Sequence, residues 1–179
     1  MSVYLIRHGK TEANEKRLYC GSTDLPLSET GREELRALHY AITPARFFTS
    51  GMKRTDETLQ ILFGTVPFEV DTRFREVNFG DFEMKSYEEL KDDPAYQLWL
   101  TDDNEANVPP HGESGVQMTR RVLEAFRELP DGTALVAHGG VIAAIMASLF
   151  PEEGKHRYQW QPQNGRGYVL DDGSYRPIP

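Results

Sequence analysis

Short runs of mostly apolar residues recur along this chain, separated by longer amphipathic segments. Each run holds three or four residues and stops at polar residues or glycine, a pattern that predicts buried β-strands. These runs are residues 3–6, 47–49, 68–70 and 134–137. Near the end of the chain, residues 168–170 and 174–176 flank an Asp-Asp-Gly turn and predict a terminal hairpin.

The segments between the strands carry apolar residues at helical spacing. A helix of about fourteen residues is predicted to open at Ser28 and to end before Pro44. A second carries Leu59 and Leu62, and a third opens at Ser114. Residues 141–149 are apolar on nearly every side, which is typical of a buried helix.

Strands that alternate with helices indicate an α/β fold with a mainly parallel sheet. No repeat, low-complexity tract or linker divides the sequence, so we expect a single domain, residues 1–179. The texture changes at 85–107, which holds seven acidic residues against two lysines. We interpret this segment as short helices laid over the sheet, a small lid or substrate wall. A solvated acidic face is the alternative.

The composition is that of a soluble globular protein, with 39% hydrophobic and 27% charged residues. A formal net charge of −8 argues against nucleic acid or a membrane surface as a partner, because either would require a basic face. Cys20 is the only cysteine, so no intrachain disulfide can form and a reducing cytoplasm fits best. No apolar stretch reaches the length of a membrane span, and Arg7 interrupts the start too early for a signal peptide. We therefore expect a cytoplasmic protein.

Two of the predicted strands are followed directly by histidines. Arg7 and His8 come after the first strand and His138 after the fourth, each histidine preceding a glycine that lets the backbone turn. Arg54 lies at the start of the helix after the second strand. Because parallel strands bring their carboxyl ends to one edge of the sheet, we expect these side chains to meet there, beside the helix N-terminus at Gly139. Two arginines, two histidines and a helix N-terminus describe a phosphate site.

Six motifs, in order, resemble those of the histidine phosphatase (phosphoglycerate mutase-like) superfamily and together span nearly the whole chain. They are residues 5–11 with Asn14, 21–31, 50–55 with Thr58, 74–83, 112–114 and 137–140. The resemblance implies a three-layer α/β/α sandwich of the phosphoglycerate mutase-like fold. It also implies phosphoryl transfer from a small-molecule phosphate ester.

The resemblance assigns roles to five residues. His8 would attack phosphorus in line and form a phosphohistidine, with its other ring nitrogen held by a backbone carbonyl. Arg7, Arg54 and His138 would bind the non-bridging oxygens, and the arginines would favour a neutral His8. Glu76 would protonate the leaving alkoxide and then activate the water that hydrolyses the phosphohistidine.

Four further positions would bind the substrate phosphate by the same resemblance: Asn14, Thr11, Gly21 and Gly139. Glu113 also matches a family position, and we interpret it as a structural or secondary acid. No metal ion and no cofactor are implied, because the arginines supply the positive charge that a cation would otherwise provide. A cysteine-dependent phosphatase would need an arginine six residues after Cys20, where Pro26 stands.

Within the superfamily, the sequence is most similar to α-ribazole-5′-phosphate phosphatases of the cobalamin pathway. An apolar wall of Phe82, Tyr87, Tyr96 and Trp99 would suit a benzimidazole nucleoside. A broad-specificity phosphatase of sugar or nucleotide phosphates is the main alternative. A phosphoglycerate mutase fits less well, because the family's mutases carry extra basic residues where this chain is short and acidic. A non-catalytic phosphate-ester-binding module also fits less well, because all five catalytic positions are filled. The physiological substrate and the oligomeric state stay open.

Overall fold

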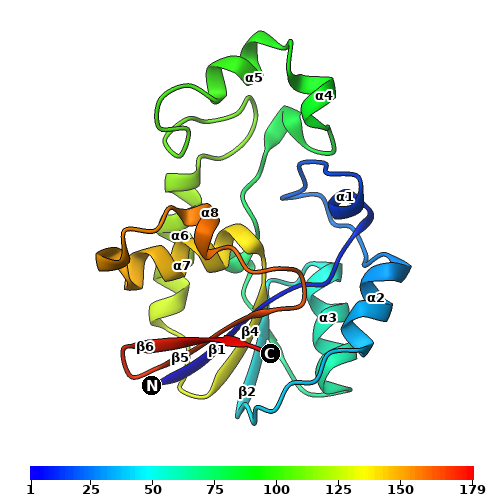
Figure 1. Ribbon diagram of the computed structural model, residues 1–179, viewed down its shortest axis with the longest axis vertical. Coiled ribbons are helices and arrows are strands. Elements are labelled where there is room, and N and C mark those ends of the chain that lie inside the picture. Colours follow the sequence, from blue (N-terminus) through cyan, green and yellow to red (C-terminus); the bar gives the residue numbers. More distant parts are fainter.

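A mixed six-stranded sheet forms the centre of the fold, with the strand order β3-β2-β4-β1-β5-β6 (Figure 1). The computed structural model describes every residue from Met1 to Pro179. Neighbouring strands from β3 to β1 pair in parallel, whereas β5 pairs antiparallel with both β1 and β6. The strands are β1 (Ser2–Arg7), β2 (Arg46–Thr49), β3 (Glu69–Val70), β4 (Thr133–Ala137), β5 (Gly167–Asp171) and β6 (Ser174–Ile178). All six predicted strands are present, and the hairpin extends the sheet beyond β1.

Eight α-helices and three single 3₁₀ turns connect the strands. The helices are α1 (Glu12–Glu15), α2 (Glu29–Arg36), α3 (Lys53–Phe63), α4 (Tyr87–Leu90), α5 (Pro94–Trp99), α6 (Gly115–Arg127), α7 (Gly139–Leu149) and α8 (Arg157–Trp160). The 3₁₀ turns are η1 (Thr72–Phe74), η2 (Gly80–Phe82) and η3 (Pro151–Glu153). None of the helices combines the length and the apolar character needed to traverse a bilayer.

Successive residues of β1 and β4 supply two hydrophobic cores on opposite faces of the sheet, because side chains alternate along a strand. Leu5 and Leu135 share the larger core with residues of α6 and α7. Ile6 and Val136 share the smaller core with Leu59 of α3. Figure 1 shows the same division, with α6, α7 and α8 on one side of the sheet and α2 and α3 on the other. The predicted three-layer α/β/α sandwich is therefore confirmed.

The helix that opens at Ser28 is shorter than its sequence pattern predicts. Ser28 caps it through its side chain, but α2 ends at Arg36 after eight residues instead of continuing toward Pro44. The following residues leave the helix, and Tyr40 and Ile42 pack against the smaller core. The Tyr40 hydroxyl also donates to the carbonyl oxygen of Gly165. Tertiary contacts thus outweigh the helical periodicity of this stretch.

The segment 85–107 contains the two short helices α4 and α5, but they do not lie over the sheet. Figure 1 shows them at the far end of the molecule from β5 and β6, beyond the edge at which the parallel strands end. They pack on a small core of their own, built around Phe82, Leu90 and Tyr96. This corrects the expected position, because a segment that buries its own apolar residues has no need of the sheet as a partner.

Candidate active site

The two histidines predicted to meet do so at the ends of paired strands. β1 and β4 run parallel with Arg7 opposite Ala137, so the residue after each strand is a histidine at the same edge. The backbone N–H of His8 donates to the carbonyl oxygen of Ala137 at 3.0 Å, extending this pairing. The ring centroids of His8 and His138 lie 5.3 Å apart. Both side chains are buried, His138 completely.

The His8 ring is oriented by its neighbour in sequence. Its Nδ1–H donates to the carbonyl oxygen of Gly9 at 2.6 Å, as expected from the sequence, and this leaves the Nε2 lone pair free. Burial lowers the pKa of His8 well below its usual value, and the charges of Arg54 and Arg7 lower it further. His8 is therefore neutral at pH 7, and its unprotonated nitrogen can act as a nucleophile.

His138 has one ring nitrogen held and one free. Its Nε2 lies 2.8 Å from the hydroxyl oxygen of Ser50, whereas its buried Nδ1 has no hydrogen-bond partner. Burial lowers the pKa of His138 well below its usual value, with further lowering from Arg54, His8 and Arg7. A buried nitrogen without a partner is costly, and His138 lines neither of the cavities described below.

Arg54 and Arg7 are held by backbone carbonyls and form no salt bridge. The buried Arg54 guanidinium donates to the carbonyl oxygens of Gly21 and Thr23, both at 2.7 Å. Arg7 donates through Nη1 to the carbonyl of Pro162 at 2.8 Å, and its buried Nε has no partner. Burial lowers the pKa of Arg7, while Glu76 acts in the opposite direction. Cations that are desolvated without a carboxylate partner create a site that favours an anion.

The Glu76 side chain lies against the N-terminus of α7. Its Oε2 accepts from the backbone N–H of Gly140 at 2.9 Å, and its Oε1 accepts from that of Val77 at 3.1 Å. A Cβ atom at position 140 would overlap the Glu76 carboxylate, so glycine at this position allows the carboxylate to approach the helix. The helix N-terminus therefore orients Glu76 through a hydrogen bond and a favourable dipole.

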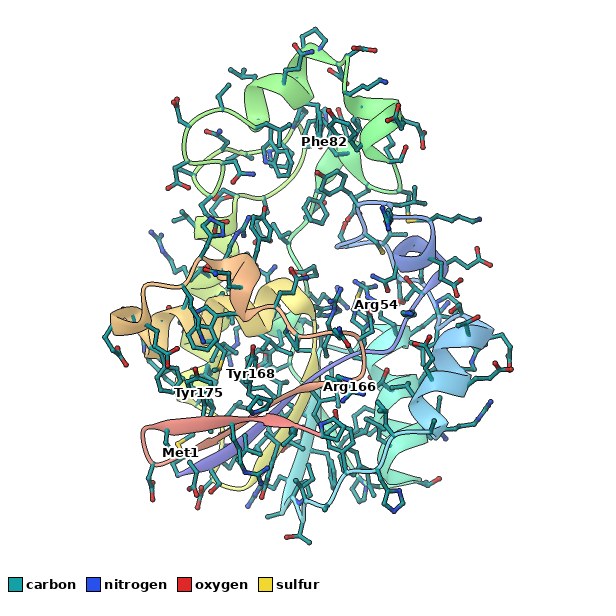
Figure 2. The ribbon with its side chains drawn as sticks, in the orientation of Figure 1. Met1, Arg54, Phe82, Arg166, Tyr168 and Tyr175 are labelled. Atoms are coloured by element: carbon teal, nitrogen blue, oxygen red, sulfur yellow. The ribbon has the colours of Figure 1, made fainter.

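These groups surround a cavity of about 160 Å³, named here the polar cavity. Figure 2 shows Arg54 between the sheet and the small core that contains Phe82. Four of the five predicted catalytic residues line it, and His138 does not. The lining residues are Arg7, His8, Thr11, Asn14, Leu18, Tyr19, Cys20, Arg54, Glu76, Phe79 and Gln161.

A second cavity of about 200 Å³, named here the aromatic cavity, adjoins the first and shares Tyr19, Glu76, Phe79 and Gln161 with it. Its other lining residues are Val77, Trp99, Met118, Gly140, Ala143, Arg157 and Tyr158. A leaving group attached to a phosphate in the polar cavity has direct access to this space, because Glu76 lies on the wall of both.

The expected aromatic wall is largely replaced by other residues. Only Trp99 of the four predicted side chains lines the aromatic cavity. Phe82 and Tyr96 are buried in the small core, where their rings pack edge to face at 5.4 Å, and Tyr87 is exposed. Phe82 and Tyr96 pack against the Trp99 ring and, like Tyr87, line neither cavity.

The predicted phosphate-binding residues Thr11 and Asn14 line the polar cavity and are tied to each other. Thr11 caps α1, and its backbone N–H and hydroxyl donate to Asn14 Oδ1 at 2.9 and 3.1 Å. The Asn14 oxygen is therefore occupied, and its Nδ2 is the group left to donate to a ligand.

Gly21 and Gly139 line neither cavity. The Gly21 amide donates to the Glu83 carboxylate at 2.9 Å, and a Cβ atom at position 21 would overlap the carbonyl oxygen of Val77. Gly139 packs tightly against Gln161. In this structure both glycines permit close approach of neighbouring segments, and the Gly21 carbonyl fixes Arg54.

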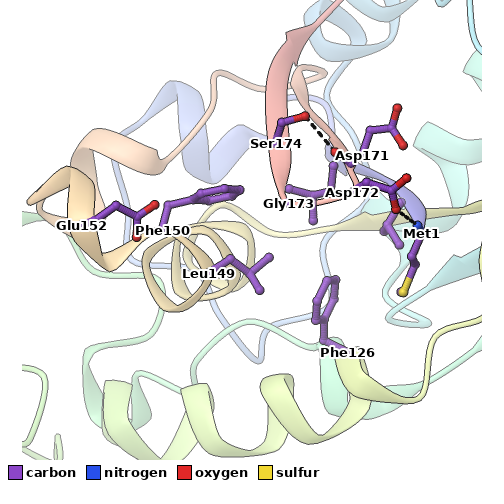
Figure 3. Close-up of a pocket in the computed structure, with 11 residues that line it drawn as sticks. Met1, Phe126, Leu149, Phe150, Glu152, Asp171, Asp172, Gly173 and Ser174 are labelled. Carbon is purple, nitrogen blue, oxygen red and sulfur yellow. Dashed lines mark hydrogen bonds and ion pairs between the residues drawn. The ribbon is translucent and has the colours of Figure 1, made fainter.

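A larger hollow of about 400 Å³ lies at the other edge of the sheet (Figure 3). It opens beside Met1, where β1 begins, between Phe126, Leu149 and the β5–β6 turn. The terminal amine of Met1 is paired with Asp172. No histidine or arginine lines this hollow, so it lacks the groups that phosphate chemistry requires.

No group of three or more His, Cys, Asp or Glu side chains is arranged to hold a metal ion. The fixed positive charges at the polar cavity belong to Arg7 and Arg54. An anionic ligand would therefore be held by guanidinium groups and by the amide donor of Asn14.

Comparison with known proteins agrees with this geometry. The family model described as histidine phosphatase superfamily (branch 1) matches residues 3–177. The chain belongs to this superfamily. As a histidine phosphatase, it is an enzyme of the phosphatase type.

Two curated relatives carry different names. The adenosylcobalamin/alpha-ribazole phosphatase of Salmonella typhimurium strain LT2 is 31% identical over 184 residues, covering 96% of this chain and 90% of the relative. The 2,3-bisphosphoglycerate-dependent phosphoglycerate mutase of Cytophaga hutchinsonii is 32% identical over 160 residues, covering 81% of this chain and 75% of the relative.

Solved structures share the fold. The phosphoglycerate mutase from Thermus thermophilus superposes with a TM-score of 0.79 at 29% identity, covering 96% of this chain and 93% of the other. A protein of Escherichia coli K-12 superposes with a TM-score of 0.86 at 24% identity, covering 99% and 94%. Likeness to both a phosphatase and mutases leaves the substrate of this histidine phosphatase to be argued from its cavities.

Several residues of the site were not found by sequence reasoning. Ser50 and Phe79 lie inside quoted motifs, so their position gave a signal, but no role followed from it. Tyr19, Tyr158 and Gln161 lie in irregular segments or in the four-residue helix α8, where no periodicity points to a cavity. Only the tertiary structure brings these three residues together.

Proposed function

We propose that this histidine phosphatase is a metal-independent phosphomonoesterase that acts through a phosphohistidine, and that its substrate is α-ribazole 5′-phosphate. The observation that carries the proposal is the unprotonated Nε2 of a buried His8 beside two arginines that lack carboxylate partners. A nucleophile and an anion-binding pair in one cavity are what phosphoryl transfer to nitrogen requires.

Catalysis proceeds in two transfers. His8 Nε2 attacks phosphorus, the phosphorus–oxygen ester bond breaks, and Glu76 donates a proton to the departing alkoxide. Glu76 then takes a proton from water, whose oxygen attacks phosphorus; the phosphorus–nitrogen bond breaks, and inorganic phosphate leaves. Arg7 and Arg54, which line the polar cavity, stabilise the oxygens of the phosphoryl group in both transfers. His138, expected from the sequence to join them, lines neither cavity in this structure.

The aromatic cavity supports the choice of α-ribazole 5′-phosphate. Tyr19, Phe79, Trp99 and Tyr158 give it flat apolar surfaces, which suit the benzimidazole of such an ester. The likeness to the Salmonella phosphatase, over 96% of this chain, points the same way. Cys20 is free, as a reducing compartment requires, and we propose that the enzyme acts in the cytoplasm.

A mutase would need a second group that binds an anion beyond the reacting phosphate. Arg157 is the only cation that lines the aromatic cavity besides the polar-cavity groups, and it is paired with Glu105. The negative charge of Glu105 offsets the positive charge of Arg157, so the pair attracts a carboxylate or a second phosphate only weakly. A broad-specificity phosphatase remains the second candidate, because aromatic surfaces accept many flat leaving groups.

The test is kcat/KM for phosphate release from α-ribazole 5′-phosphate, 3-phosphoglycerate, sugar phosphates and nucleotides, with and without EDTA. A preference of about a hundredfold for α-ribazole 5′-phosphate, roughly 2.7 kcal/mol in the transition state, supports the proposed substrate. A flat profile favours the broad-specificity candidate. Loss of activity in EDTA would contradict the metal-independent mechanism.

The nucleophile is tested separately by His8→Asn. We expect phosphate release and acid-labile phosphoenzyme to vanish for every ester, because no other unprotonated nitrogen is placed to attack. His39→Asn is the matched control, since His39 is exposed and lies away from both cavities. Turnover by folded His8→Asn at the wild-type rate would contradict a phosphohistidine on His8.

A further inference from the structure

Glu76 lies in irregular chain between the 3₁₀ turns η1 and η2. A proton-transfer group must be held close to its productive geometry, and loops hold such groups less accurately than helices or strands do. The hydrogen bond from Gly140 orients the carboxylate, but it does not fix the backbone that carries it. The support for that backbone comes from α6.

The Arg121 guanidinium, on α6, donates hydrogen bonds to the backbone of the segment that ends at Glu76. Its Nη1 donates to the carbonyl oxygens of Arg73 and Arg75, both at 2.6 Å. Its Nη2 donates to the carbonyl oxygen of Glu76 at 3.1 Å. One side chain therefore binds three backbone carbonyls within four residues of sequence.

Glu113 pairs with Arg121 and also bonds to the chain that follows Glu76. It accepts from Arg121 Nε at 2.9 Å and from Nη2 at 2.7 Å, a bidentate pair. The backbone N–H of Glu113 donates to the carbonyl oxygen of Asn78 at 2.8 Å, and the Asn78 N–H donates back to the Glu113 carboxylate at 3.3 Å. The backbone of residues 73, 75, 76 and 78 is thus hydrogen-bonded to one ion pair.

We propose that Arg121, oriented by Glu113, is a positioning residue for proton transfer by Glu76. Neither Arg121 nor Glu113 lines the polar or the aromatic cavity, so both act through the loop and not on the substrate. The inference rests on the proposed function, which makes Glu76 the acid and base. It also explains Glu113, whose carboxylate orients Arg121 and does not face the ligand.

The arrangement requires arginine in particular. Five N–H groups in a planar fork can serve three carbonyls and a carboxylate together, whereas the compact ammonium of lysine cannot span them. Arg121→Lys therefore keeps the charge and loosens the loop. The expected defect is a misplaced Glu76 carboxylate in an otherwise intact cavity.

Leaving groups separate this defect from general damage. A primary-alcohol ester such as α-ribazole 5′-phosphate needs a proton on its leaving oxygen, whereas p-nitrophenolate leaves as a stable anion. We expect Arg121→Lys and Glu113→Gln to lower kcat/KM for the alcohol ester by about 10²-fold and to change that for p-nitrophenyl phosphate little. The ratio of the two values does not depend on the folded fraction, so partial unfolding cannot imitate the result.

The matched control is Arg120→Lys, the exposed neighbour on α6, which should leave both values unchanged. Glu76→Gln is measured alongside and should show the same dependence on the leaving group, but stronger. Equal losses on both esters for Arg121→Lys, with Glu76→Gln behaving as expected, would overturn this inference alone. Equal losses for Glu76→Gln would instead refute the proposed acid.

Discussion

The polar cavity and the aromatic cavity share a wall at Glu76, yet the fold builds them in different ways. The cationic and nucleophilic groups of the polar cavity come from the end of β1 and the start of α3, and backbone carbonyls hold them: Gly9 orients His8, and Gly21 and Thr23 hold Arg54. The aromatic cavity is made from rings on four separate segments, three of which pack on one another through their side chains. These rings are Tyr19, Phe79, Trp99 and Tyr158.

This difference separates chemistry from selectivity. Groups held by backbone carbonyls keep their geometry when nearby side chains change, so the groups proposed for phosphoryl transfer can remain constant. Tyr19 and Trp99 pack against the small core beyond the sheet edge, so they can be exchanged without disturbing the strands. We expect substitutions of Arg7, His8 or Arg54 to affect all esters alike, and substitutions of the rings in the aromatic cavity to affect some.

With His8 left in place, a large effect on every ester should come from Arg54→Lys in the polar cavity. Lysine cannot hold the carbonyls of Gly21 and Thr23 while also presenting two donors to a phosphoryl group. We expect kcat/KM to fall about 10²- to 10³-fold for every ester, as when one donor to a developing charge is removed elsewhere. Lys53→Met, at the exposed neighbouring cation, should have no such effect. A loss restricted to aromatic esters would show that Arg54 contributes to selectivity, and would contradict the assignment of separate roles to the two cavities.

A smaller and selective effect is expected from Trp99→Leu in the aromatic cavity. The indole faces the cavity and packs at 5.8 Å from Tyr19, so its loss removes a flat contact surface from the leaving group. We expect kcat/KM for α-ribazole 5′-phosphate to fall about thirtyfold, roughly 2 kcal/mol, while that for a small alkyl phosphate is retained. Leu98→Ala is the control, because Leu98 is 71% exposed and lines neither cavity. Equal losses on both esters would mean that Trp99 serves stability alone.

The same contrast explains how far the sequence predicts this molecule. His8 and His138 follow their strands directly, so a correct strand assignment places both at one sheet edge without any knowledge of side-chain packing. The orientation of His8 is equally local, because its partner carbonyl belongs to the next residue. The mainly parallel sheet and the meeting of the two histidines were therefore accessible from local pattern and parallel pairing, whereas the three layers were implied by the family resemblance.

The aromatic cavity was not accessible in this way. Phe82 and Tyr96 are aromatic residues near the site in sequence, yet they became core, because a short segment beyond the sheet must bury something of its own. Arg121 was missed for a related reason. Its partner Glu113 precedes α6, so the pair lacks the three- or four-residue spacing that marks a helical ion pair.

The smallest expected effect is on the pH dependence of the free energy of unfolding, to which the buried His8 contributes. The pKa of His8 in the folded protein is lowered well below 6.5 by burial and by two arginines, whereas the unfolded chain returns it to an ordinary value. Below pH 6.5 the unfolded state therefore binds a proton that the folded state does not, and the free energy of unfolding falls as the pH falls. The slope from this residue is about 1.4 kcal/mol per pH unit until the folded pKa is reached. His8→Asn should remove that part of the slope in denaturant titrations between pH 6.5 and 5, whereas the exposed-site variant His39→Asn should retain it. Identical slopes for wild type and His8→Asn would mean that His8 takes up a proton in the folded cavity, and the neutral nucleophile would then be lost over the same pH range.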